Sequence, residues 1–565
     1  MRPYPPIKPN TIPQNDYSYA INYAEYKVKE IMKKNDLPSI SVALIDDQDI
    51  IMQNSYGYAN LEENILATPE TVYRMGSVAK VFTAMEIMRL YNEGLVDLDA
   101  PITDYIPDFS IKSRFQDNTS ITIRSLLTHR SGLPRNGNLP YWYFDSGVNI
   151  LRDYVSSLKH SSLAFPTGYR FKYSNIAYNI LGRIIEILRP SIFPFYMRDD
   201  LLREIGMNQS SFLSIDVAPT DDIAVGYYNE NGKNHPIEHS DIISFASGNL
   251  YSSLQDMAEF TRFVFRGGKT GSTQIIANET LQLMFEEQPS QPRDTQTMGL
   301  GWFTGKVKNT EKVVFHGGDG DGVHSIVALL PERKLGVVLI GNSVEFSTPI
   351  NYFAWEILEI MLETKYGIIL QDDSSYTAID IDSSLLANYT GKYVVENDII
   401  EVFLKGTNKL KINALGFDMD LIPVSNSKFR VKHWLLDFGR FDVEFFPSTE
   451  IEDKFLKVTL EGAAQFYAPS YPEENEISSF SQNFFGVYDS YPSNSSIYFT
   501  GDTLGRYELT MEDGILKLGS NFILKPISET EIIILSGAFV GETMTYDEST
   551  KSIYWSSYIY TQVES

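Results

Sequence analysis

Residues 74–80 read Arg-Met-Gly-Ser-Val-Ala-Lys, and apolar residues at helical spacing follow directly from Ala79 to Leu90. The pattern predicts an amphipathic helix with Ser77 near its N-terminus and Lys80 one turn later on the same face. A helix N-terminus favours negative charge on a serine, and a lysine that burial keeps neutral can accept the proton of a nearby hydroxyl. The same serine–x–x–lysine spacing occurs at two other places in the chain, so an exposed lysine on a helix is the alternative interpretation.

A second candidate segment, Tyr173-Ser174-Asn175, follows 96 residues after Ser77 and precedes a predicted helix over 176–188. A tyrosine near a lysine can have a lowered pKa, and it can then serve first as a base and afterwards as an acid. An asparagine two residues later can hydrogen-bond a substrate amide. The alternative interpretation is a helix N-cap formed by Ser174 or Asn175.

Two segments compete as the third element of a site. Lys269-Thr270-Gly271 lies among glycines after a predicted helix, which is typical of a flexible surface loop. His316-Gly317-Gly318 instead ends a predicted strand over 312–315, and further strands are predicted over 325–330 and 335–340. A hydrogen-bonding residue on a strand, followed by glycines, lets a substrate backbone lie alongside, so we favour His316.

Three motifs in this order resemble those of the penicillin-recognising serine hydrolases: Ser77/Lys80, Tyr173/Asn175 and His316/Gly318. That family includes class C β-lactamases, D-Ala-D-Ala carboxypeptidases, esterases and D-aminopeptidases. Four further stretches resemble family segments: Leu126–Pro134, Ala246–Met257, Gly299–Trp302 and Pro331–Asn342. The resemblance extends from about residue 20 to about residue 365.

The resemblance implies a covalent mechanism. Ser77 would attack a carbonyl carbon and form an acyl-enzyme, while Lys80 and Tyr173 would first activate Ser77 and then protonate the leaving group. The backbone N–H groups of Ser77 and, by family analogy, Asp319 would form an oxyanion hole for the tetrahedral state. Neither a metal nor another cofactor is expected.

Four residues are expected to bind substrate: Asn175, His316, Gly317 and Gly318. Asn175 would orient the substrate amide, and His316 would hydrogen-bond the substrate or Tyr173. Typical β-lactamases of the family have lysine where this chain has His316, and histidine there resembles the D-aminopeptidases and other peptidase-like members. The glutamate base that class A β-lactamases supply from an E-x-x-L-N segment is absent from the sequence.

The charge and the hydrophobic pattern of the sequence change near residue 370. From Gln371 to Ser565 there are 30 acidic and 14 basic residues, a net charge of −16 out of −26 for the whole chain. Short alternating runs of Val, Ile, Phe and Tyr follow, over 399–404, 410–412, 441–446, 496–500, 507–511 and 532–535. Regularly spaced strands without helices predict a sandwich or a barrel.

The strand-rich part shows signs of an internal division. Polar linkers are predicted at 371–376 and 469–476, and the stretch 388–393 resembles 484–488, each with an aromatic residue before a glycine and a tyrosine after it. This suggests two related β modules, with chance similarity in a Tyr- and Phe-rich tail as the alternative. The D-aminopeptidases of the family also carry two C-terminal β-barrel domains.

We therefore expect an α+β fold with three domains. Residues 1–370 are expected to form a β-lactamase/transpeptidase-like domain, an antiparallel sheet with flanking helices plus an α-helical subdomain. Residues 384–469 and 478–565 are expected to form all-β barrel modules, lipocalin-like by the resemblance.

Composition excludes several classes of function. With 47 basic and 73 acidic residues, the chain is a poor binder of nucleic acid or of an anionic membrane. No cysteine is present, so thiol nucleophiles and cysteine metal sites are excluded. No run of 18 apolar residues and no signal peptide are visible. We expect a cytoplasmic protein if the chain is complete, and a periplasmic or secreted one otherwise.

The sequence thus predicts a serine hydrolase for a small peptide, amide or ester, with a D-aminopeptidase- or D-Ala-D-Ala carboxypeptidase-like peptidase as the leading hypothesis. Esterase, acyl-transferase or β-lactamase activity is the alternative within the family, because the acyl-enzyme chemistry is shared. A catalytically inactive binding or scaffold protein is the alternative of another class. Acylation by β-lactams is compatible with this prediction, and so is assembly into a homo-oligomer.

Overall fold

The computed structural model describes most of the chain, namely residues 4–116, 119–137, 150–217, 223–238, 241–308, 310–347, 349–370, 376–396, 398–414, 416–432, 441–460, 464–471, 486–490, 506–512, 515–519, 522–528, 530–547, 549, 551–555 and 558–563. The predicted strand over 496–500 and most of both predicted linkers lie outside the described residues. The boundaries proposed for the three domains therefore stay predictions.

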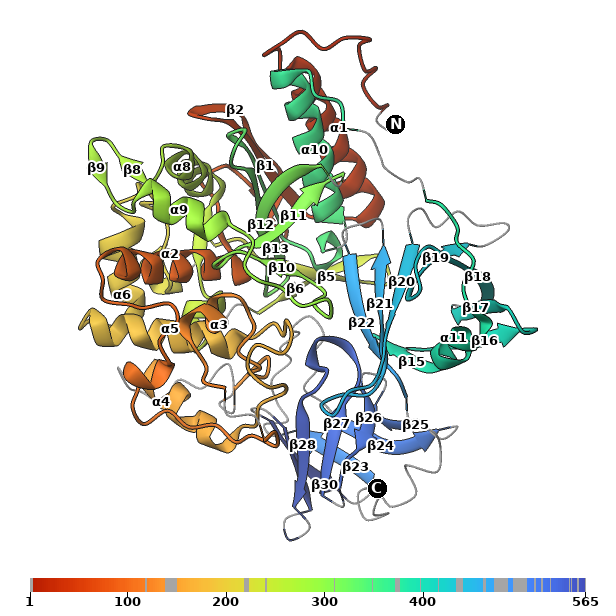
Figure 1. Cartoon of the computed structure of the whole chain (residues 1–565). Coiled ribbons are helices and arrows are strands. Elements are labelled where there is room, and N and C mark those ends of the chain that lie inside the picture. Colours follow the sequence, from red (N-terminus) through yellow and green to blue (C-terminus); the bar gives the residue numbers. More distant parts are fainter. Residues whose placement is uncertain are drawn as a thin grey trace.

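An antiparallel sheet of eight strands forms the centre of the N-terminal part (Figure 1). Strands β1, β13 and β14 are buried along almost their whole length, which explains their continuous apolar sequences. The strand order is β10 (Thr297–Met298), β11 (Phe303–Val307), β12 (Glu311–Gly320), β13 (Val323–Leu330), β14 (Leu335–Gly341), β1 (Ser39–Asp46), β2 (Asp49–Asn60) and β3 (Ile65–Leu66).

Helices cover both faces of this sheet. On one face, α1 (Ser18–Asn35) packs beside α10 (Pro349–Tyr366), so the two ends of the N-terminal part lie side by side (Figure 1). The buried residues of α1 are Ala20, Ala24, Val28 and Ile31, which form one stripe at helical spacing. Helix α8 (Leu254–Phe265) packs against β1 and β14 and lies among the core residues of the other face.

Helix α2 (Ala79–Asn92) lies at the centre of the second layer, where it contacts α5 (Asn175–Leu188) and α7 (Phe245–Gly248). The predicted helix is confirmed, but the prediction that it is amphipathic is wrong, because 11 of its 14 residues are buried. A helix surrounded by other elements has no solvent face to keep polar. The other helices are α3 (Ile123–Leu127), α4 (Ile150–Ser157), α6 (Phe193–Met197), α9 (Asn278–Phe285) and, beyond the N-terminal part, α11 (Ser383–Leu386).

Three small two-stranded sheets complete the N-terminal part. They pair β4 (Val72–Arg74) with β7 (Tyr251–Ser253), β5 (Gly226–Glu230) with β6 (Lys233–Ile237), and β8 (Lys269–Thr270) with β9 (Thr273–Gln274). The first of these leads directly into Met75 and Ser77. Within the described part of the chain, no helix is both long and apolar enough to cross a membrane.

Among the described residues, the C-terminal part contains two antiparallel units of eight strands each (Figure 1). The predicted all-β fold of this part is confirmed, and the second of the two units is a closed barrel. The first contains β15 (Gly391–Val395), β16 (Asp398–Lys405), β17 (Lys409–Ala414), β18 (Phe417–Pro423), β19 (Lys428–Lys432), β20 (Phe441–Phe446), β21 (Phe455–Leu460) and β22 (Ala464–Pro469). The second is a closed barrel of β23 (Gly486–Ser490), β24 (Arg506–Glu512), β25 (Ile515–Leu518), β26 (Phe522–Pro526), β27 (Glu531–Ile534), β28 (Thr543–Asp547), β29 (Ser552–Trp555) and β30 (Tyr558–Val563). The two similar stretches of sequence each lead into the first strand of a unit.

The first β unit docks on the N-terminal part through a buried arginine. The Arg170 guanidinium carbon lies 3.7 Å from the ring centroid of Tyr467 and 5.0 Å from that of Phe165. Its Nη1 lies 3.5 Å from Oε2 of Glu452, whose other oxygen lies 2.8 Å from Nη1 of Arg293. Because these side chains are almost fully buried, the ion pairs and the cation–π contact are little screened by water.

Replacing Arg170 with alanine should loosen this interface. We expect Arg170→Ala to lower the free energy of unfolding by about 2 kcal/mol or more, because a cation–π contact and one partner of a buried carboxylate are lost. Thermal unfolding followed by circular dichroism measures the effect. The matched control is Arg152→Ala, at an exposed arginine whose ion-pair partner among the described residues is its neighbour Asp153. An equal unfolding midpoint for both variants would contradict the assigned role.

Candidate active site

Ser77 and Lys80 are brought together by the turn that starts α2. Ser77 lies in a 3₁₀ turn over Gly76–Val78, and α2 continues from Ala79. Nζ of Lys80 lies 3.1 Å from Oγ of Ser77 and donates to the carbonyl of Ser247 at 2.6 Å. The lysine side chain is fully buried and, among the described residues, has no carboxylate partner.

The surroundings of Lys80 favour its neutral form. Burial lowers the pKa of Lys80 well below its ordinary value, and the positive charge of Arg135 lowers it further. The negative charge of Asp319 acts in the opposite direction without reversing the shift. A neutral amine at 3.1 Å from a serine hydroxyl can accept the hydroxyl proton.

Tyr173 lies over Lys80 and reaches Ser77. Nζ of Lys80 is 4.8 Å from the Tyr173 ring centroid, and the Ser77 side chain is close enough to the phenol to lower its pKa. The lowered tyrosine pKa expected from the sequence is wrong for the free protein. Burial raises the pKa of Tyr173 to about 12, because its effect is larger than the opposing effects of the nearby Ser77 side chain and of the Arg135 charge. Tyr173 is therefore a neutral phenol that can donate a proton.

The loop that carries Tyr173 is fixed by its neighbours. Ser174 caps α5, since its Oγ accepts from the N–H of Ala177 at 3.2 Å, so the alternative N-cap interpretation is correct for this residue. The N–H of Ser174 donates to Nδ1 of His129 at 3.1 Å. Asn175 begins α5 and its side-chain Nδ2 donates to Oδ1 of Asn136 at 2.9 Å. Tyr173 and Asn175 thus project from one short stretch of backbone that the Ser174 cap holds in place.

His316 is neutral, and its two ring nitrogens have different roles. Its Nδ1 lies 2.7 Å from the carbonyl of Gly317, so Nδ1 carries the proton and donates it, because a carbonyl can only accept. Burial and the charge of Lys80 lower the pKa of His316 to about 3. Nε2 therefore carries a lone pair, and it accepts no hydrogen bond from the residues that the structure describes.

Two glycines let β12 approach the Ser77 turn closely. A Cβ at Gly318 would lie 1.9 Å from the carbonyl oxygen of Met75, and one at Gly76 would lie 2.4 Å from that of Asp319. Strand β11 pairs with β12 only as far as Phe315, so the next residues of β12 present an unpaired edge to this turn. The backbone of Asp319 therefore lies beside the residue that precedes Ser77, as an oxyanion hole would need.

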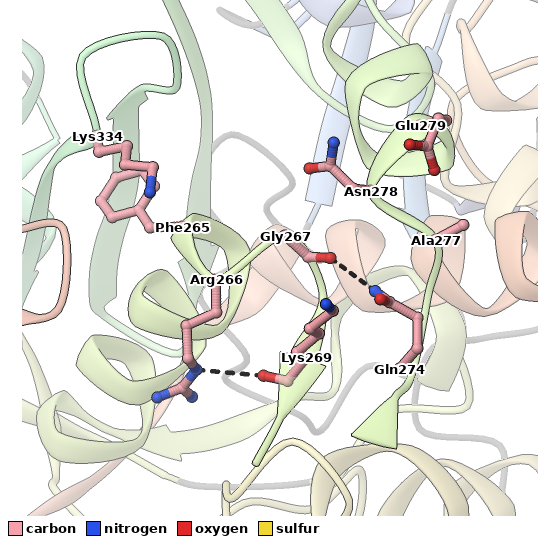
Figure 2. Close-up of a pocket in the computed structure, with 9 residues that line it drawn as sticks. All are labelled: Phe265, Arg266, Gly267, Lys269, Gln274, Ala277, Asn278, Glu279 and Lys334. Atoms are coloured by element: carbon pink, nitrogen blue, oxygen red, sulfur yellow. Dashed lines mark hydrogen bonds between the residues drawn. The ribbon is translucent and has the colours of Figure 1, made fainter. Parts of the chain in front are cut away.

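Lys269 lies in a different environment. It is exposed on the hairpin of β8 and β9, as expected for a surface loop. Lys269 lines a pocket of about 440 Å³. Figure 2 shows it with the other lining residues, among them Arg266, Asn278 and Lys334. None of the nine lining residues belongs to the cluster around Ser77.

The structure adds residues that the sequence analysis did not assign to the site. His129 is fully buried, and its ring lies 4.3 Å from that of Tyr173. The carbonyl of Ser247 accepts from Lys80, and His324 hydrogen-bonds Asp319. Arg135 lies against the Tyr173 ring at 5.1 Å. His129 and Ser247 lie within family-like segments of the sequence, whereas Arg135 and His324 lie outside them and had no signal in the sequence.

Adding a methyl group at Gly318 should separate β12 from the Ser77 turn. We expect Gly318→Ala to lower the free energy of unfolding by about 1–3 kcal/mol, because the new Cβ would meet backbone rather than a flexible side chain. Urea unfolding followed by fluorescence measures this. Gly305→Ala on β11 is the matched control, since its nearest neighbours would lie 3.7 Å away, and a Gly318 variant as stable as this control would refute the close approach.

Comparison with known proteins gives the family. The beta-lactamase family model matches residues 25–358. Protein flp of Staphylococcus aureus strain MW2 is 26% identical over 319 residues, which make up 56% of this chain and 61% of that protein. The unguisins hydrolase ungD' of Aspergillus campestris is 25% identical over 356 residues, or 60% of this chain and 64% of that protein. The chain thus matches less than two thirds of each relative.

Solved structures share the fold. An octameric penicillin-binding protein homologue from Pyrococcus abyssi is 25% identical with a TM-score of 0.52, covering 79% of this chain and 99% of that one. SurE is 20% identical with a TM-score of 0.56, covering 80% and 99%. The D-amino acid amidase of Ochrobactrum anthropi is 21% identical with a TM-score of 0.51, covering 61% and 99%. The predicted fold class is confirmed, and the chain belongs to the beta-lactamase family.

Proposed function

We propose that this protein is a serine hydrolase that cleaves an amide bond of a small peptide or amide through an acyl-enzyme. The observation that carries the proposal is the buried amine of Lys80, 3.1 Å from the hydroxyl of Ser77 and without a carboxylate partner among the described residues. A structural lysine in the interior would be paired with a carboxylate. A lysine left neutral beside a serine is suited to remove its proton.

Acylation begins with proton transfer from Oγ of Ser77 to Nζ of Lys80. Oγ attacks the substrate carbonyl carbon, and the carbonyl oxygen gains negative charge, which the backbone N–H groups of Ser77 and Asp319 stabilise. The neutral phenol of Tyr173 donates its proton to the leaving nitrogen and regains one from Lys80. The C–N bond breaks, the amine leaves, and the acyl group stays on Ser77 as an ester.

Hydrolysis of the ester reverses these proton movements. Lys80, neutral again, accepts the proton of a water molecule that attacks the ester carbonyl, and Oγ of Ser77 leaves with a proton that Lys80 returns to it. Asn175 orients the substrate amide, and Nε2 of His316 accepts a hydrogen bond from a substrate N–H or from Tyr173. His316, Gly317 and Gly318 form the strand edge along which the substrate lies.

The comparisons support amide substrates. The relatives include a protein named as an unguisins hydrolase and the structural neighbours include a D-amino acid amidase. Esterase or acyl-transferase activity is the second candidate, because the same acyl-enzyme serves it and one neighbour is described as a hydrolase with promiscuous acyltransferase activity. Hydrolysis rates for D- and L-aminoacyl amides, acyl esters and nitrocefin rank these activities, and faster cleavage of esters than of every amide would favour the second.

Labelling with a fluorophosphonate tests the nucleophile and the base. We expect Ser77→Ala to abolish covalent labelling and Lys80→Arg to slow it by about 10²–10⁴-fold, since a guanidinium cannot act as base. Lys269→Arg on the exposed hairpin is the matched control and should react like the wild type. Circular dichroism checks that each variant is folded. Equal labelling of wild type and Ser77→Ala, or none of the wild type, would refute a catalytic Ser77 and favour a binding protein.

The pH profile tests the protonation states. Lys80 works as a base when deprotonated, so kcat/KM should rise with pH through its lowered pKa and then stay level. His316, with a pKa of about 3, and Tyr173, with a pKa of about 12, titrate outside the measured range of about pH 5 to 10. His316 and Tyr173 therefore add no inflection in this range, and no descending limb is expected. A descending limb below about pH 9 would contradict the neutral phenol assigned to Tyr173.

A further inference from the structure

A turn of the second barrel reaches the loop that carries Tyr173. Residues Gly537–Phe539 form a 3₁₀ turn between β27 and β28, and Glu542 follows this turn just before β28 begins. The side chain of Glu542 is almost fully buried. A buried carboxylate needs charged or hydrogen-bonding partners that replace its lost hydration, so its partners indicate what it does.

Glu542 is connected to the chain on both sides of Tyr173. Its Oε1 lies 3.1 Å from Nζ of Lys172, the residue before Tyr173. The same oxygen accepts from the N–H of Arg135 at 2.7 Å, and the carbonyl of Arg135 accepts from the N–H of Asn175 at 2.8 Å. One carboxylate oxygen is thus linked to Lys172 and, through one backbone group, to Asn175, and Tyr173 lies between these two residues.

The barrel holds Glu542 in a fixed orientation. Its Oε2 accepts from Nε1 of Trp555 at 3.1 Å, and its own N–H donates to the carbonyl of Phe539 at 3.0 Å. The rings of Phe539 and Trp555 pack edge to face, with centroids 4.8 Å apart. Lys172 also donates to the carbonyl of Ala538 at 2.7 Å, so both of its acceptors belong to the same turn of the barrel.

Other contacts attach this part of the barrel to the N-terminal part. Arg114 donates to the carbonyl of Gly541 at 3.2 Å and to Oγ1 of Thr543 at 3.0 Å. A Cβ at Gly541 would lie 2.5 Å from the ring of Phe165, so the two surfaces meet closely there. These contacts dock the barrel without involving Lys172 or Asn175. The links from Glu542 are instead directed at the loop that carries Tyr173.

We propose that Glu542 is a positioning residue for the reaction: through Lys172 and the backbone of Arg135 it holds the Tyr173 phenol where it can protonate the leaving group. The proposal rests on the proposed function and deepens it, because Tyr173 acts as an acid in that mechanism. A general acid must lie within hydrogen-bond reach of the atom that it protonates, and a displacement of about 1 Å can slow a reaction about 10²-fold. Docking of the second barrel is thereby coupled to proton transfer.

Two leaving groups that differ in their need for a proton test this role. The substrates are the benzyl and p-nitrophenyl esters of the acyl group that the wild type cleaves fastest. Benzyl alkoxide must be protonated as it leaves, whereas p-nitrophenolate leaves without a proton. The value of kcat/KM for each ester reports the steps up to acylation, and the benzyl-to-nitrophenyl ratio cancels any general loss of active protein. Tyr173→Phe sets the full effect and should lower this ratio by about 10²–10⁴-fold.

Three variants remove the links of Glu542 in steps. Lys172→Met and Glu542→Gln each lose the ion pair, while the glutamine keeps an acceptor for the N–H of Arg135, and each should lower the ratio about threefold or more. Glu542→Ala loses both links and should lower the ratio about tenfold or more. Asp453→Asn is the matched control, since Asp453 is a more exposed carboxylate that pairs with Lys525 of the second barrel, and it should keep the wild-type ratio.

The double variant Lys172→Met/Glu542→Gln separates positioning from stability, and it keeps the test decisive if Glu542→Ala does not fold. It removes both charges of the pair, so its thermal unfolding midpoint should exceed those of the single variants, while its ratio stays low. A wild-type ratio in the double variant, or equal changes with both esters in the Glu542 variants, would overturn the proposal and leave Glu542 a docking role alone. Absence of fluorophosphonate labelling in the wild type would instead refute the proposed function.

Discussion

Burial of the Lys80 amine without a neutralising carboxylate is the constraint on which the candidate site depends. An ammonium ion in such a place is strongly disfavoured, so the lysine is held neutral. The fold makes this state available by surrounding α2 on nearly all sides and by giving Nζ the carbonyl of Ser247 as an acceptor. A neutral His316 at the same site agrees with this constraint, because a second fixed cation would add repulsion without a partner to balance it.

The stretch from Tyr169 to Asn175 connects this site to the C-terminal units. Arg170 pairs with Glu452 of the first unit, and Lys172 pairs with Glu542 of the second. Both cations lie within three residues of Tyr173. The acidic C-terminal part, with its net charge of −16, thus supplies buried carboxylates that pair with the loop that carries Tyr173. The docked units therefore fix the backbone that presents Tyr173 and Asn175.

The elements near the site were predictable from local pattern. The helix over Ala79–Leu90, the strand leading to His316 and the surface hairpin with Lys269 each follow from periodicity or from glycine content over a few residues. Protonation was not predictable in the same way. The pKa of Tyr173 is raised rather than lowered, because burial outweighs the effects of the nearby Ser77 side chain and of the positive charge, and burial depends on elements remote in sequence.

The order of the motifs, the elements that carry them and the strand-rich character of the C-terminal part follow from the sequence alone, because helical and strand periodicity and glycine placement are local properties. Which side chains meet depends on the packing of the folded chain. Arg135 had no signal of its own in the sequence, because its contact with Tyr173 and the hydrogen bond from its N–H to Glu542, 407 residues away, arise from packing. Distances, burial and charge balance arise from such long-range packing, and these quantities decide what Lys80, Tyr173 and His316 can do.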